Sequence, residues 1–287
     1  MEVPCSLEND LRSPGILLDI HDWSVATKVL IPKEHGAWAI LYGPFILTIT
    51  LFGRFEFRVL VFFVAITALF LAHEPISKLV RTYGHGVARS QLLYWKRWLL
   101  VYLVAALVCG FYLFWNYSLW LLVPLGLLIA FLMCLHLYLV GRRRERSVWG
   151  ELLGVVGLTS TAPASCYVIS GTWEYPCLLL WLLSFLYFAS GVFYVKMRVS
   201  RHIKTGEHLQ HVRHCVAYHS FLLIALLLLS WYGLISKILI LAYLPIIVRA
   251  LAGAFAREER LNIRRIGFNE LGQSLVFIVL FVVFWNY

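Results

Sequence analysis

The sequence predicts an all-α fold, a polytopic helical membrane bundle of about nine transmembrane helices. Two features of the composition support this fold: 61% of the 287 residues are hydrophobic and only 14% are charged, whereas soluble domains average about half apolar and about a quarter charged. A third observation is that the apolar residues form windows of roughly 17 to 25 residues, the length that crosses about 30 Å of hydrocarbon. The chain is therefore expected to lie in a bilayer.

The predicted spans follow one another from residue 36 to the end of the chain. They are 36–53, 57–73, 98–115, 118–140, 149–170, 175–195, 216–232, 235–254 and 268–286. The window 57–73 is the shortest. Helices are the expected spanning element because hydrocarbon offers no partner for a free backbone amide, and the windows are too long and too uniformly apolar for barrel strands.

The residues before the first window have a different character, because acidic side chains are spread along them. These are Glu2, Glu8, Asp10, Asp19 and Asp22. The segment lacks the basic start and the small-residue cleavage site of a signal peptide. We therefore expect a cytoplasmic N-terminal extension at 1–30 and a nine-helix transmembrane domain at 31–287.

The distribution of Lys and Arg predicts the orientation of the bundle. With nine crossings, all but three of the 25 basic residues fall on the side of the N-terminus; the exceptions are Arg54, Arg58 and Lys237. Short basic loops stay in the cytoplasm, so the N-terminus is expected inside and Tyr287 outside. This pattern accounts for the net charge of +10 and makes membrane lipids the expected partners. No separate basic face indicates nucleic-acid binding.

Ionisable residues collect at the predicted cytoplasmic helix ends, where burial is costly. Glu74 and Glu151 are the candidate acid or base residues. The candidate substrate-binding residues are Glu34, His35, His73, Lys78, Arg81, Tyr194, Lys196, Arg198, Arg249 and Glu270, and His136 is expected about one turn inside the same face. Each residue alone can be an interfacial anchor with a snorkelling side chain. The set instead suggests one polar pocket open to the cytoplasm, because headgroups do not attract carboxylates.

The fifth window contains an unusual run of small residues, "GVVGLTSTAPASCYVISG" at 154–171. Small residues permit close helix approach, or they leave room for a ligand chain. Pro163 is expected to bend this helix near the middle of the bilayer.

The cysteines and histidines give no clear metal or disulfide signal. Six cysteines lie far apart, mostly within apolar windows, without a CxxC pair, so neither a disulfide framework nor a metal site is expected. The spacing of His208, His211 and His214 would suit a Zn or Cu site, but solvated histidines are favoured. No cofactor is indicated.

Several motifs resemble the YwiC-like family of bacterial membrane proteins, from about residue 30 to the C-terminus. They are "PKEHGAWAILYGPF" at 32–45, "FLAHEPISKLV" at 70–80, "GELLGVVGLTSTAPA" at 150–164, "YFASGVFYVKMR" at 187–198 and "IGFNELGQSL" at 266–275. This resemblance implies a location in the bacterial plasma membrane. It implies no particular activity.

The basic loop and small-residue helix at 141–171 are also similar, more faintly, to the UbiA superfamily of intramembrane prenyltransferases. In that superfamily two Asp-rich motifs bind Mg²⁺ and a prenyl diphosphate. The corresponding segments here, 72–81 and 194–208, contain no aspartate. The resemblance therefore implies a lipid-shaped cavity that has lost or replaced the usual metal chemistry.

These observations leave three functions open. The first is an enzyme that acts on an isoprenoid, quinone or other lipid, with the anionic head held by the basic residues at 78, 81, 196 and 198. The second is a proton-coupled or small-anion transporter, although the outer half of the bundle has few polar residues. The third is a binding or assembly factor for a membrane complex.

Overall fold

The computed structural model describes residues 29–32, 35–53, 56–83, 86–203, 208–255 and 263–285. The regular secondary structure of these residues is helical, and no strand occurs among them. The elements in chain order are α2 (His35–Phe52), α3 (Phe57–Arg81), α4 (Arg89–Tyr117), α5 (Leu122–Gly141), α6 (Val148–Thr159), α7 (Thr161–Ser170), α8 (Tyr175–Ile203), α9 (His208–Trp231), the 3₁₀ helix η2 (Lys237–Tyr243), α10 (Leu244–Phe255) and α11 (Ile263–Trp285).

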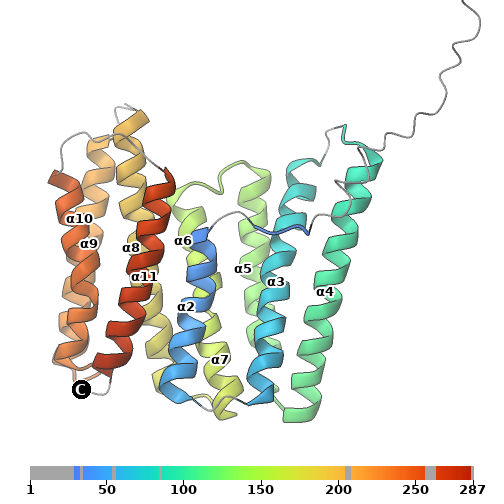
Figure 1. The fold of residues 1–287 in the computed structure, drawn as a ribbon, viewed down its shortest axis with the longest axis horizontal. Helices are drawn as coiled ribbons and strands as arrows, with labels where there is room; N and C mark the ends of the chain where they lie inside the picture. Colours follow the sequence, from blue (N-terminus) through green and yellow to red (C-terminus); the bar gives the residue numbers. More distant parts are fainter. Residues whose placement is uncertain are drawn as a thin grey trace, which may run out of the picture.

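The described elements make nine passages along the bundle, which confirms the predicted fold class. The fifth passage consists of α6 and α7, and the eighth of η2 and α10. Within the described part of the chain, eight passages are long and apolar enough to cross a membrane, and the remaining passage, α2, contains a shorter apolar helix. In Figure 1, α2, α6 and α7 lie between α3, α4 and α5 on one side and α8 to α11 on the other.

The prediction that 57–73 is the shortest span is wrong. Helix α3 has 25 residues and continues about two turns past His73 and Glu74. It ends where the backbone amide and the hydroxyl of Thr82 both donate to the carbonyl of Lys78, at 3.1 and 2.7 Å. The apolar window marked only the part of the helix that suits hydrocarbon, because hydropathy does not detect a polar helical extension. Helix α8 likewise runs beyond its predicted end, to Ile203.

The predicted bend in the fifth passage is present as a break between α6 and α7 at Ser160. Pro163 has no amide hydrogen to donate to the carbonyl of Thr159, so the regular helical ladder is interrupted there. The Thr161 hydroxyl donates to the carbonyl of Leu41 at 2.9 Å. Ala162 to Ile169 are all buried. These contacts favour close helix packing as the reason for the small residues.

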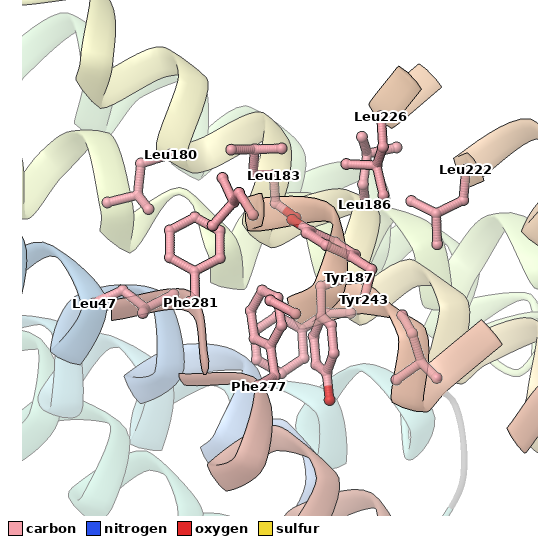
Figure 2. Packing of buried hydrophobic residues seen from close by; sticks show 14 of the residues in the cluster. Leu47, Leu180, Leu183, Leu186, Tyr187, Leu222, Leu226, Tyr243, Phe277 and Phe281 are labelled. Carbon is pink, nitrogen blue, oxygen red and sulfur yellow. The ribbon is translucent and has the colours of Figure 1, made fainter. Parts of the chain in front are cut away.

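The main apolar core lies among α8, α11, η2 and their neighbours (Figure 2). The rings of Tyr187 and Phe277 stack with their centroids 3.6 Å apart. Tyr243 is fully buried, and its hydroxyl donates to the carbonyl of Leu183 at 2.9 Å. A buried tyrosine hydroxyl needs such a partner, so this bond fixes η2 against α8.

Helix α4 shows how the outer surface differs from that of a soluble protein. It packs chiefly on α3, and Leu107, Phe111 and Trp115 are 70%, 63% and 71% exposed. Such a continuous apolar surface would be an aggregation hazard in water. Acyl chains are the environment that suits it.

The expectation that no disulfide forms is wrong for one pair of cysteines. Cys166 near the end of α7 is bonded to Cys177 near the start of α8, and their Cα atoms are 5.8 Å apart. Gly171 ends α7 in the left-handed conformation, with φ of 75°, and the short connection reverses the chain. Sequence spacing alone does not reveal this reversal, because both cysteines lie within apolar windows.

Candidate functional site

The predicted site residues that the structure describes gather near one end of the bundle. We call this the basic end and define it by Arg81, Arg142, Arg144 and Lys196. It is the end where α2, α6 and α9 begin and where α3, α5 and α8 finish (Figure 1). Residues 1–28, Glu34, the side chain of His35 and residues 204–207 lie outside the described residues. Predictions on these positions remain predictions.

The first group of contacts joins α3 to α5. His73 Nε2 lies 3.3 Å from His136 Nδ1, and the Ser77 hydroxyl lies 3.3 Å from the same His73 nitrogen. One imidazole must donate and the other accept, so at least one of the two facing ring nitrogens carries no proton. His73 was a candidate from the sequence, but its direct partner was not predicted.

Two ion pairs lie farther along α3. Glu74 and Lys78 are one turn apart and 3.2 Å from each other, and both side chains are partly exposed. Arg81 reaches Glu145 in the α5–α6 connection at 3.1 Å. The sequence analysis missed Glu145. Its one signal was its position as the single carboxylate inside the basic run 142–146.

The second group joins α6 to α8 through Glu151 and Lys196. The ammonium group of Lys196 donates to Glu151 Oε1 at 2.9 Å and to the carbonyl of Arg146 at 2.6 Å. Helix α6 begins just before this pair, where the amide of Gly150 donates to the Ser147 hydroxyl at 3.1 Å. Such a bond satisfies one of the free amides at a helix start. The α5–α6 connection is therefore tied to α3 by Glu145 and to α8 by Arg146.

The third group lies among α8, α10 and α11. The guanidinium of Arg249 donates to both carboxylate oxygens of Glu270, with Nη2 3.2 Å from Oε2. The ring of Tyr194 lies under the guanidinium, 4.1 Å from its carbon to the ring centroid. Three predicted residues thus meet here. Arg198 follows on α8, two positions beyond Lys196.

An open hollow of about 450 Å³ lies at the basic end between α3 and α5. It is lined by Ile76, Leu79, Val80, Tyr83 and Gly141. Arg81 and Arg142 directly follow two lining residues in the chain. An apolar hollow next to cations is suited to a ligand with an apolar chain and an anionic end.

The histidines at the start of α9 also have identified neighbours. His208 Nδ1 lies 3.3 Å from the Ser200 hydroxyl, and Arg201 Nε donates to His208 Nε2 at 3.2 Å. The rings of His211 and His214 are 6.4 Å apart. In the part of the chain that the structure describes, no three metal-ligating side chains gather.

The passages, the lipid-exposed apolar surface and the charged end define a multi-pass α-helical membrane protein. Residues 31–166 match the family model described as YwiC-like protein. This match confirms the predicted resemblance to the YwiC-like family over that part of the chain.

Two curated relatives extend the comparison. The chain is 29% identical over 169 residues to the uncharacterized protein YwiC of Bacillus subtilis (strain 168), which covers 59% of this chain and 66% of that protein. It is 24% identical over 262 residues to an uncharacterized protein of Haemophilus influenzae, which covers 89% of this chain and 98% of the relative. No solved structure matches the chain. Both relatives are described as uncharacterized, so they indicate no activity.

Proposed function

We propose that this protein binds an anionic isoprenoid, quinone or other lipid at its basic end and acts on it as an enzyme. The observation that carries the proposal is the apolar hollow between α3 and α5, whose lining residues Val80 and Gly141 directly precede Arg81 and Arg142 in the chain. The hollow would take part of the tail. The guanidinium groups would hold the anionic head through charge-assisted hydrogen bonds.

The orientation that we propose places the basic end in the cytoplasm of a bacterium and the other end outside. The excess of Lys and Arg at one end supports it, because basic loops resist translocation. A second support is the Cys166–Cys177 bond, which lies near the opposite end. Disulfides persist in the oxidising compartment outside the plasma membrane.

Glu74 and Glu151 remain the candidate acid or base residues. Glu74 forms an ion pair with Lys78, and Glu151 forms one with Lys196. An anionic head that draws one of these ammonium groups away would leave the carboxylate free to accept a proton. In this scheme the lysine binds the substrate and the glutamate performs the proton transfer.

Native mass spectrometry of the purified protein tests the binding step. We expect a retained anionic lipid in the wild type and at least about tenfold weaker retention in Leu79→Trp, because the indole fills the hollow. Leu107→Trp on the lipid-facing side of α4 is the matched control and should retain the lipid. Preparations without lipid, or equal retention by both variants, would contradict the binding proposal.

The catalytic step is tested separately once the retained lipid is identified. Glu74→Gln and Glu151→Gln keep the side-chain size and remove the proton acceptor. We expect at least one of them to stop turnover of that lipid while still binding it. Full turnover in both variants would rule out these carboxylates.

A further inference from the structure

The C-terminal helices contain a polar centre that the lipid proposal does not use. Arg249 and Glu270 lie within two of the passages that are long and apolar enough to cross a membrane. Their side chains are only 12% and 22% exposed. Ionisable groups at such positions are costly, so a specific role is the default expectation.

The helices approach so closely here that a bulky ligand has little room. A Cβ atom added at Gly191 would lie 3.2 Å from Glu270 Oε2. A Cβ atom at Gly253 would lie 2.8 Å from the Tyr194 ring. Gly191 lets α8 pack against Glu270 of the ion pair, and Gly253 lets α10 pack against the ring of Tyr194. A proton is a ligand that needs no added space.

Several buried polar atoms around the pair have no hydrogen-bond partner among the residues that the structure describes. They are Arg249 Nε, Gln273 Oε1 and His219 Nε2. His219 on α9 is 2% exposed, and its Nδ1 lies 2.8 Å from the carbonyl of Cys215. Because a carbonyl only accepts, Nδ1 carries the proton, and Nε2 of the neutral ring is a buried acceptor for which the described part of the chain supplies no donor. His219 lies one turn along α9 from Cys215, which packs in one cluster with Ala250, the residue after Arg249.

We propose that Glu270 binds and releases a proton inside the α8–α11 unit, with Arg249 as the fixed countercharge and His219 as a second acceptor. When the carboxylate takes a proton, it becomes a carboxylic acid and loses its attraction for the guanidinium. When the proton leaves, the ion pair forms again. No other co-reactant is needed.

The other titratable groups around the pair come from the helices packed against it. Among the described residues, Tyr187 and Tyr194 of α8, Cys215 of α9 and Tyr243 of η2 belong to this set. On α2, the hydroxyl of Tyr42 is turned away, toward Thr67 of α3. Among the described residues of this group, Glu270 is the carboxylate and His219 is the imidazole.

Infrared spectroscopy of the full chain in vesicles tests the proposal directly. The difference spectrum between the wild type and Glu270→Gln should contain a carboxylic-acid band that grows as the pH falls, because the other carboxylates are common to both proteins and cancel. Glu74→Gln should keep this band. A difference spectrum without the band, or its loss in Glu74→Gln, would overturn the proposal.

Glu270→Gln leaves Arg249 without its countercharge and can fail to fold, so two milder variants provide a second test. Arg249→Lys keeps the positive charge, and His219→Asn keeps a side-chain donor near the Cys215 carbonyl. We expect each to shift the midpoint of the band by at least about half a pH unit, because each changes the charge or polarity next to Glu270. An unchanged midpoint in both variants would eliminate the assigned roles of Arg249 and His219.

Discussion

At the residue scale, two kinds of glycine occur in the same part of the bundle. Gly253 on α10 faces Tyr194 so closely that any side chain would clash, whereas Gly272 on α11 has open space around its missing Cβ. The sequence shows both as glycines within apolar windows. Only the position of the neighbouring helix separates a required glycine from a replaceable one.

Gly253→Ala is therefore expected to destabilise the protein by about 1 to 3 kcal/mol, because the new methyl group overpacks the contact with Tyr194. Gly272→Ala should instead be neutral or stabilising by up to about 1 kcal/mol, since alanine favours the helical conformation and its methyl group contacts no neighbouring atom. Thermal unfolding in detergent compares the two. Equal midpoints would show that α8 and α10 do not approach as described.

The candidate residues show what the sequence predicts at this scale. It predicted that Glu151, Lys196, Arg249 and Glu270 lie at one end, because helix direction and hydropathy fix their depth. It did not predict which of them pair, because neighbouring helices are chosen by packing. Glu145, the partner of Arg81, was missed, and the contact of His136 with His73 was not predicted.

At the scale of elements, the α5–α6 connection is bonded to a helix on each side, α3 and α8. Arg81 holds Glu145 from α3, and Lys196 holds the Arg146 carbonyl and Glu151 from α8. Lys196 is the more buried of these two cations, at 16% against 53% side-chain exposure. Its contacts are therefore expected to contribute more to stability.

Lys196→Met should lower the free energy of unfolding by about 1 to 3 kcal/mol, because it leaves a carboxylate and a carbonyl without their donor. Lys78→Met removes a partly exposed pair within one helix and should cost less than about 0.5 kcal/mol. Unfolding in a denaturing detergent measures both values. If the two variants unfolded alike, Lys196 would be an interfacial anchor and not a link between helices.

At the scale of the whole molecule, the sequence predicted the nine passages well because crossing hydrocarbon imposes a fixed length and polarity. The missed features are those that such a window cannot detect. The polar end of α3 lies past its apolar segment, and the Cys166–Cys177 bond depends on a tight chain reversal at Gly171. The arrangement of the helices around α6 and α7, whose apolar window is 67% buried, likewise follows from packing.

The predicted orientation is tested with a cysteine reagent that cannot cross the membrane. Ser118→Cys places a thiol between α4 and α5 at the end opposite the basic residues, and Arg144→Cys places one in the basic connection. Intact cells or spheroplasts should label the first variant above the parent chain and leave the second at the parent level. The reverse pattern would invert the orientation and place the basic end outside.

The break at Ser160 divides the fifth passage into two helices that are linked to α8 by different kinds of bond. Helix α7 is covalently fastened to α8 through Cys166, while α6 carries Glu151 and is held to α8 through the ion pair with Lys196. An ion pair can open and close, but the covalent bond cannot stretch. If an anion draws Lys196 away, we expect the displacement to involve α6, the twelve-residue helix that bears Glu151 and ends at the break at Ser160.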